Sequence, residues 1–388
     1  MKLLLALTYY HPHVSGLTIY VQRLAEGLAG RGHEVTVITA RHETNLPEEE
    51  ILNGVRVVRV SAPLRISKGV FMPSYPLIAA RLLKACDAVV VNLPGTPGET
   101  LLVLLARTLL RRPTVAVYHC DLQLSGGRLS RWIDRAVFAN NWLVGRLVHR
   151  FIAYTQDYAE HSPLLRRFSS KIRVIPPPVA VTPADPSEVR SFRSRYSLNG
   201  EKLIGFPARL ATEKGVEVVL RALSRIREKL GPVRVLFAGP HKDVLGEEHY
   251  LKKLEPLLRA EGDTWIFLGV LSPHEMAVFY GACDLVVLPS LNSTESFGLV
   301  QVESMLSGTP VVASDLPGVR VPIQTTGMGV IALPGDVEAF ADAVVKVIEN
   351  RGLYCRERSF VLEQFSLERT LRDYEKLLLS LIEEQTRH

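Results

Sequence analysis

The 388-residue sequence is poor in cysteine and has no long apolar run. Its four cysteines lie far apart and form no C-x-x-C pair. This spacing argues against a disulfide scaffold or a zinc site and favours free thiols in a reducing cytoplasm. The longest apolar candidate, residues 101–106, is much shorter than the ~20 residues that cross a bilayer, and residues 3–7 are too few for a signal peptide. We therefore expect a cytoplasmic protein, soluble or peripheral on the inner face of the membrane.

Several ligand-binding motifs are also missing. The sequence contains no G-x-x-x-x-G-K-[ST] phosphate loop and no D-x-D pair of the kind that holds a divalent ion in many sugar-nucleotide enzymes. Residues 327–332 match G-x-G-x-x-A, but no convincing strand precedes them, and we interpret them as a loop that enters a short strand. An NAD-dependent oxidoreductase is excluded because its glycine fingerprint is lacking.

What the sequence does contain is an alternation of short Val/Ile-rich runs with helical patterns. Because the expected strands are apolar throughout, the alternation predicts parallel sheets covered by helices on both faces, in two Rossmann-like, doubly wound α/β domains. The expected strands are 2–10, 33–40, 55–62, 85–94, 114–121, 151–156, 202–209, 233–240, 264–270, 284–290 and 309–315. The expected helices are 17–32, 98–111, 214–230, 247–261, 273–282, 297–307 and 367–385.

The alternation lapses around residues 176–200, which begin with a proline-rich stretch, and this interruption predicts the domain boundaries. We expect an acceptor-binding domain over 1–178, an extended linker over 179–200 and a nucleotide-sugar domain over 201–365. A C-terminal helix over 366–388 could return to the first domain. Two such sheets facing each other would form a cleft at the carboxyl ends of their strands, where sheets of this kind bind ligands.

Two glutamates stand in an otherwise apolar segment after strand 284–290. Glu295 lies in the strand-to-helix loop, and Glu303 follows about two helical turns later. Between them, Ser296, Phe297, Gly298 and Leu299 open the expected helix, whose first amides favour an anion such as phosphate. The carboxylates could accept hydrogen bonds from sugar and ribose hydroxyls. The alternative is a helix-start acid and a solvated helix residue, which the apolar surroundings disfavour.

Three further strand-to-helix loops contain candidate residues. Arg209 and Lys214 place two cations beside a helix start, as a diphosphate requires, although surface cations are common at such positions. His119 ends a strand of the first domain and could donate to a sugar oxygen, take part in the reaction as a catalytic residue, or have a structural role. Gly16 lies in the first turn, where a phosphate or sugar could approach the backbone. No metal site is expected, since His11 and His13, which precede that turn, lack further ligands nearby.

The charge is unevenly distributed. Residues 1–180 contain 22 Lys and Arg against 12 Asp and Glu, whereas acidic residues are in excess in the remainder. Segment 128–150 combines Trp132, Trp142, Phe138 and Leu147 with arginines. Such a composition could rest on an anionic bilayer, or it could be an ordinary core helix with arginine edges.

The chain resembles the retaining glycosyltransferases of family 4, which have the GT-B fold. The resemblance covers nearly the whole sequence. Its most specific element is the E-x7-E motif from Glu295 to Glu303, which is followed by the Ser307-Gly308-Thr309-Pro310 turn. The supporting elements are Arg209, the run Glu213-Lys214-Gly215, the junction Arg31-Gly32-His33-Glu34-Val35, and His119.

The resemblance implies roles for individual residues. Glu295 would contact the donor sugar, and Glu303 the ribose. Arg209 and Lys214 would neutralise the diphosphate leaving group. The remaining donor contacts would be His119 near the sugar, the backbone of Val270 and Leu271 at the base, and the amides of Ser296, Phe297, Gly298 and Leu299.

The predicted activity is sugar transfer from a UDP- or GDP-linked donor to a glycan, lipid-linked or small-molecule acceptor, with retention and without a metal. We expect no cofactor and no nucleic-acid partner, and we keep an anionic membrane surface as a further partner. The alternatives are a sugar-nucleotide epimerase on the same fold and a module that binds a sugar nucleotide without turnover.

Overall fold

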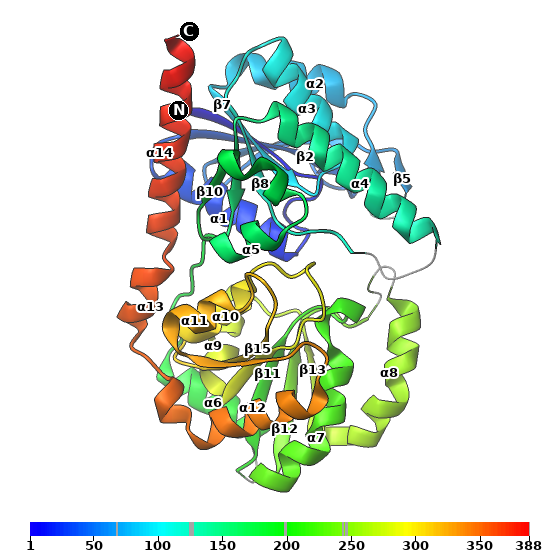
Figure 1. The fold of residues 1–388 in the computed structure, drawn as a ribbon, viewed down its shortest axis with the longest axis vertical. Coiled ribbons are helices and arrows are strands. Elements are labelled where there is room, and N and C mark those ends of the chain that lie inside the picture. Colours follow the sequence, from blue (N-terminus) through cyan, green and yellow to red (C-terminus); the bar gives the residue numbers. More distant parts are fainter. Residues whose placement is uncertain (67–68, 124–127, 198–199, 243, 245–246, 388) are drawn as a thin grey trace. The chain divides into compact units, whose positions relative to one another are not determined.

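The structure, a computed structural model, describes residues 1–66, 69–123, 128–197, 200–242, 244 and 247–387. It divides into two compact units, each with its own parallel sheet (Figure 1). The first unit is Met1–Pro178 together with Leu367–His388, and the second is Val179–Ser366.

The first unit is built around an eight-stranded sheet in the order β10-β9-β8-β7-β1-β2-β4-β3. All neighbouring strands are parallel except β3 and β4 at one edge. Its strands are β1 Lys2–Ala6, β2 Glu34–Arg41, β3 Glu49–Leu52, β4 Val55–Ser61, β7 Ala88–Leu93, β8 Thr114–Tyr118, β9 Arg150–Ala153 and β10 Ile172–Val174, beside the small hairpin β5 Leu64–Ile66 and β6 Gly69–Phe71. Its helices are α1 Gly16–Gly30, α2 Tyr75–Ala85, α3 Pro97–Thr108, α4 Arg128–Leu147, α5 Gln156–His161, η1 Leu165–Lys171 and α14 Leu367–Thr386.

Helices cover both faces of this sheet. On one face α2, α3 and α4 pack side by side, and their apolar residues join those of the strands in one buried core. On the other face α1 packs against β2 and β4 and also against α14, the last helix of the chain. The strands β1, β7 and β8 are buried over almost their entire length, as the apolar runs predicted.

Polar contacts attach α14 to α1 and to the turn that follows it. The hydroxyls of Tyr20 and Tyr374 share a buried hydrogen bond. Arg31 and His33 both bind Glu375, with Arg31 Nη2 at 2.8 Å and His33 Nε2 at 2.7 Å from its carboxylate. The Arg31–Val35 junction, which the sequence singled out, therefore fastens the C-terminal helix to the first unit.

The second unit contains a fully parallel six-stranded sheet in the order β13-β12-β11-β14-β15-β16. The prediction of two doubly wound α/β domains is thus confirmed. Its strands are β11 Lys202–Pro207, β12 Val233–Ala238, β13 Trp265–Gly269, β14 Leu285–Leu288, β15 Val311–Ser314 and β16 Gly329–Ala332. Its helices are α6 Pro186–Tyr196, η2 Thr212–Lys214, α7 Val216–Leu230, α8 Glu248–Glu261, η3 Gly262–Thr264, α9 Pro273–Ala282, α10 Leu299–Leu306, α11 Val321–Thr326, α12 Val337–Glu349, η4 Arg351–Tyr354 and α13 Arg358–Gln364.

Within residues 179–200, for which we expected an extended linker, the structure contains helix α6. Asp185 caps this helix, since its side chain accepts from the amide of Ser187 at 2.7 Å, and Pro186 occupies the first helical position. The prolines of this segment obscured that start. Helix α6 packs against α9 of the second unit.

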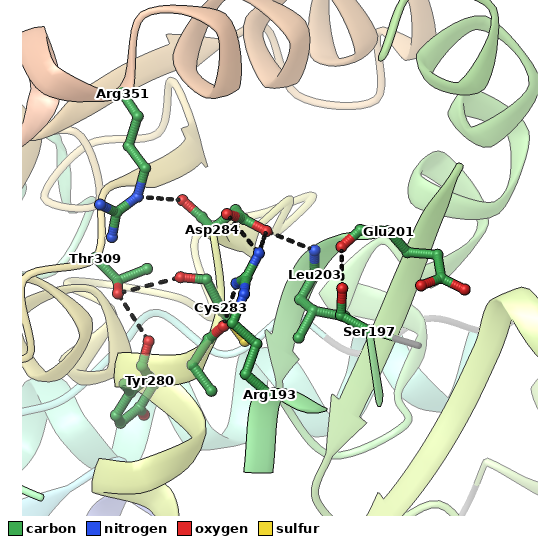
Figure 2. A network of polar contacts seen from close by, with 10 residues as sticks. Arg193, Ser197, Glu201, Leu203, Tyr280, Cys283, Asp284, Thr309 and Arg351 are labelled. Carbon is green, nitrogen blue, oxygen red and sulfur yellow. Dashed lines mark hydrogen bonds and ion pairs between the residues drawn. The ribbon is translucent and has the colours of Figure 1, made fainter. Parts of the chain in front are cut away.

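A polar network at the amino ends of β11 and β14 fixes this packing (Figure 2). Arg193 of α6 donates to the carbonyl of Ala282 at 2.7 Å and to both carboxylate oxygens of Asp284. Asp284 in turn accepts from the amide of Leu203 at 2.8 Å. Thr309 Oγ1 donates to the carbonyl of Tyr280 at 2.7 Å and lies 3.4 Å from that of Cys283. The network ties the end of α9 to the sheet, on the edge opposite to the strand-to-helix loops discussed next.

Candidate active site

The central pair of strands in the second unit marks the expected ligand edge. Strand β11 is the first strand of this sheet in the sequence and lies near its centre. Strands β12 and β13 lie on one side of it, and β14, β15 and β16 lie on the other. The strand order therefore reverses between β11 and β14, and open α/β sheets bind ligands at the carboxyl edge of such a reversal. The loops after these two strands contain Arg209, Lys214 and Glu295.

The loop after β11 contains both predicted cations. The Arg209 guanidinium forms an ion pair with Glu213 and lies 3.9 Å from the carboxylate of Glu247. The Glu247 carboxylate also accepts from the amide and the hydroxyl of Thr212. Arg209 remains partly exposed and so could exchange these carboxylates for a ligand anion.

Lys214 joins the β11 loop to the β14 loop. Its Nζ lies 2.6 Å from Glu295 Oε2, and the amide of Leu291 donates to the carbonyl of Glu213 at 2.9 Å. The backbones come so close that a Cβ on Gly215 would lie 2.0 Å from the carbonyl oxygen of Pro289. Gly215 also has a φ of 69°, so glycine is required here on both counts. The predicted cation and the predicted acid are thus direct neighbours.

The start of α10 is shaped by Gly298. This residue caps the helix with a φ of 77°, and a Cβ on it would lie 2.3 Å from Leu288. The side chain of Phe297 is buried against Phe365, and Ser296 is also buried, so both face the protein interior. The main-chain amides at a helix start are the groups that the prediction assigns to a ligand here. Leu299 is the first helical residue, two positions later than predicted.

Glu303, the second acid of the motif, lies inside α10 and is 9% exposed. The hydroxyl of Tyr280, from the neighbouring helix α9, donates to Glu303 Oε2 at 2.8 Å. Tyr280 is itself 1% exposed. A carboxylate with so little exposure is not a solvated helix residue, so that alternative is excluded.

The structure places Val270 and Leu271 directly after β13, at the same carboxyl edge of the sheet. Val270 is 58% exposed, so it is open to a ligand that reaches along this edge. Val270 and Leu271 therefore lie at the end of the edge strand β13, which is separated from β11 by β12.

In the first unit, Gly16 is the first residue of α1, after the capping side chain of Ser15. A Cβ on Gly16 would meet no atom within 4 Å, and its φ is not in the left-handed region. The fold therefore does not require glycine at this position. The open space is compatible with the predicted approach of a ligand to the backbone.

His119 follows β8 and is held by two residues that the sequence did not indicate. The hydroxyl of Tyr154 binds Nδ1, and Nε2 lies 2.8 Å from Asn92 Oδ1. Asn92 Nδ2 donates to the carbonyl of Ala6 at 2.9 Å, which turns Oδ1 toward the histidine. This arrangement fits the neutral tautomer that carries its proton on Nε2. Asp121, two positions further along the chain, accepts hydrogen bonds from three hydroxyls, those of Tyr118, Tyr158 and Ser162.

Burial lowers the pKa of His119 to about 3, and burial also lowers the pKa of His149. Because an unfolded histidine titrates near 6.5, the unfolded chain binds more protons between these values. The stability contributed by neutral His119 is therefore complete above about pH 6.5 and is lost as the pH falls toward 3. Between pH 7 and pH 5, we expect the melting temperature of His119→Gln to fall by less than that of the wild type. Part of the pH dependence should remain, because His149 is still present.

Differential scanning fluorimetry at several pH values measures this slope. The exposed His274→Gln variant is the control and should keep the wild-type dependence. An unchanged slope in His119→Gln would contradict the neutral, buried state of this ring.

The sequence alone did not indicate three residues that contact Glu303 or His119: Tyr280, Asn92 and Tyr154. Asn92 was the one detectable case, since it is a lone amide inside the apolar run 88–93. The two tyrosines read as ordinary core residues, and only the packing of neighbouring elements brings their hydroxyls to Glu303 and His119.

Among the described residues, no group of three or more His, Cys, Asp or Glu side chains is placed to hold a metal ion. In the same part of the chain, no helix combines the length and the apolar character that spanning a membrane demands.

Family models match both halves of the chain. The model described as Glycosyltransferase Family 4 matches residues 14–182, and the model described as Glycosyl transferases group 1 matches residues 189–359. The chain belongs to the family 4 glycosyltransferases. The resemblance inferred from the E-x7-E motif is thereby confirmed, and so is the prediction that the chain is a glycosyltransferase.

This glycosyltransferase has relatives of similar length. It is 28% identical to an uncharacterised glycosyltransferase of Methanocaldococcus jannaschii, with 91% of this chain and 90% of the relative covered. It is 29% identical to the D-inositol 3-phosphate glycosyltransferase of Xylanimonas cellulosilytica, over 88% and 85% of the two chains. The phosphatidyl-myo-inositol mannosyltransferase of Mycobacterium leprae is 28% identical, over 88% and 86%.

Solved structures support the GT-B fold of the glycosyltransferase. The sucrose-phosphate synthase of Thermosynechococcus elongatus superposes with a TM-score of 0.80 at 21% identity, covering 99% of this chain and all of that one. A protein of Anabaena solved with UDP-glucose gives a TM-score of 0.78 at 20% identity, covering 98% and 100%.

Proposed function

We propose that this glycosyltransferase moves a sugar from a UDP- or GDP-linked donor to an acceptor hydroxyl, with retention of configuration and without a metal. The observation that carries the proposal is the pairing of Lys214 with Glu295 at the strand-order reversal, beside the start of α10. A cation, main-chain amides and an acid at one edge suit a nucleotide diphosphate whose sugar presents hydroxyls. The UDP-glucose in the Anabaena structure supports this donor class.

In the proposed reaction, the bond from the anomeric carbon to the diphosphate oxygen breaks, and a bond to the acceptor oxygen forms. Negative charge grows on the leaving diphosphate, where Lys214, Arg209 and the amides of α10 would stabilise it. The acceptor proton would pass to the departing phosphate oxygen. Glu295 would accept from donor-sugar hydroxyls, and Glu303 from the ribose.

The other assigned residues have supporting roles in this proposal. The backbone of Val270 and Leu271 would contact the base, and the turn at Gly16 would contact the donor. His119 would serve the donor sugar as a neutral hydrogen-bonding group, and for that its Nε2–H must exchange Asn92 for the ligand. The inositol-based acceptors in the names of the relatives favour a polyol, which in this chain could be lipid-linked.

A thermal-shift panel of UDP-, GDP- and ADP-sugars tests the donor class. A donor at about 100 times its dissociation constant stabilises the folded state by about 2.7 kcal/mol, which raises the melting temperature by several degrees. The proposal fails if no nucleotide sugar produces a shift. With the donor identified, the anomeric configuration of the product by NMR tests retention, and full turnover in EDTA tests metal independence.

We also propose that α4 rests on an anionic membrane surface. Trp132 is 68% exposed and Leu143 46% exposed on this helix. The guanidinium of Arg135 lies 5.8 Å from the ring centre of Trp132, and that of Arg146 lies 5.2 Å from Trp142. The exposed positions that share this face are Trp132, Arg135, Ala136, Ala139, Trp142, Leu143 and Arg146. Tryptophan, leucine and arginine on one helix face suit the interface of anionic lipids.

We expect the chain to co-sediment with vesicles that contain phosphatidylglycerol at low salt, and expect Trp132→Gln/Trp142→Gln to reduce the bound fraction several-fold. Leu77→Gln, which changes a 79% exposed residue of α2, is the control and should bind normally. Absence of wild-type binding, or equal loss in the control, would rule out this surface.

A further inference from the structure

Tyr280 lies outside the E-x7-E motif but contacts Glu303, the last residue of that motif. Tyr280 is the eighth residue of α9 and is 1% exposed, and its hydroxyl donates to Glu303 Oε2 at 2.8 Å. Burial of a carboxylate is unfavourable unless a donor compensates for the lost water. The phenol is such a donor, and it also determines how the carboxylate is rotated about its last bond.

Tyr280 is held at its main chain as well as at its hydroxyl. Its carbonyl accepts from Thr309 Oγ1 at 2.7 Å, as Figure 2 shows. The carbonyl of Thr309 accepts from Ser304 Oγ at 2.9 Å, and Ser307 Oγ donates to the carbonyl of Glu303 at 3.0 Å. The Ser307–Pro310 turn that follows the E-x7-E motif therefore fastens the end of α9 to α10. The fixed end of α9 gives the phenol a defined position.

A fixed carboxylate matters for the recognition of a ribose. The two ribose hydroxyls are neighbouring donors, and a carboxylate binds them well only when its oxygens already face them. Because the phenol holds Oε2, the direction of Oε1 is defined. The carboxylate therefore loses little conformational freedom when a ribose binds. Without the phenol, the carboxylate would lose this constraint on its orientation and bind the same hydroxyls less well.

We propose that Tyr280 is a positioning residue that gives the enzyme its preference for ribonucleotide donors, by orienting Glu303 toward the ribose hydroxyls. This inference rests on the proposed function, in which Glu303 binds the ribose. It assigns a role to a residue outside the motif and makes the discrimination between ribose and deoxyribose a joint property of α9 and α10.

The test compares Tyr280→Phe, Glu303→Gln and the wild type by isothermal titration calorimetry. The probes are whichever of UDP, GDP and ADP binds most tightly, and its 2′,3′-dideoxy analogue. We expect the wild type to prefer the ribose form by about 10–100-fold, as hydrogen bonds to a charged group provide. Tyr280→Phe should weaken binding of the ribose form about 5–20-fold and leave the dideoxy form within 2-fold. Tyr250→Phe, at a buried tyrosine on α8, is the matched control.

The remaining outcomes separate the inference from the proposed function. If Glu303→Gln loses the ribose preference and Tyr280→Phe keeps it, Glu303 binds the ribose but the role of Tyr280 is refuted. Equal weakening of both ligands in Tyr280→Phe would mean a structural role only and would also refute it. If Glu303→Gln keeps the preference, the ribose assignment itself is wrong, and the inference falls with it.

Discussion

The Glu295→Gln variant is expected to lower kcat/KM by about 10²–10³-fold while binding the nucleoside diphosphate at least as tightly as the wild type. The rate should fall because a carboxylate that accepts from two sugar hydroxyls contributes about 1.5–3 kcal/mol per hydrogen bond. Diphosphate binding should not fall, because Glu295 Oε2 lies 2.6 Å from Lys214 Nζ and competes with phosphate for that cation. The neutral amide removes this competition.

Initial rates with the donor found by thermal shift, and calorimetry with its nucleoside diphosphate, measure the two effects. Glu338→Gln, at an exposed position on α12 of the same unit, is the control and should match the wild type in both. Full activity in Glu295→Gln would refute the role of the carboxylate. A large loss of diphosphate affinity would mean that Glu295 organises the phosphate site instead of competing with it.

The residue positions that the sequence identified share one property. Arg209, Lys214 and Glu295 all follow apolar strands, and the carboxyl ends of parallel strands meet at one edge of a sheet. This rule needs only the order of strands and loops, so it could be applied without coordinates. The spacing of Glu295 and Glu303 required no more than helix geometry.

The contacts that give these residues their chemistry could not be predicted in the same way. The phenol of Tyr280 reaches Glu303 because α9 packs beside α10, and Asn92 reaches His119 because β7 pairs with β8. Such neighbours depend on the packing of elements and leave no mark on local periodicity. Helix α6 was missed for a different reason, since its capping Asp185 and Pro186 lie in a proline-rich stretch that resembles a linker.

The Lys214→Met variant is expected to show the second large effect, a loss of about 10²–10³-fold in kcat together with weaker binding of the nucleoside diphosphate. Loss of one preorganised donor to a developing charge has this magnitude. Binding should weaken for two reasons, because the attraction of the ammonium is lost and because Glu295 is left without that partner and repels the phosphates. Arg225→Met, which breaks an exposed ion pair with Asp342 in the same unit, is the control and should retain full activity.

The double variant Lys214→Met/Glu295→Gln separates these two causes. If repulsion by the unpaired carboxylate contributes, the double variant should bind the nucleoside diphosphate more tightly than Lys214→Met alone, although its turnover stays low. The recovered affinity then measures the coupling between the two side chains, which are in direct contact and therefore not expected to act additively. Calorimetry on the four proteins of this cycle gives the coupling. Equal affinities in Lys214→Met and the double variant would show that the Glu295 carboxylate does not repel the bound phosphates. The proposed competition between Glu295 and phosphate for Lys214, argued from the 2.6 Å ion pair, would then be wrong.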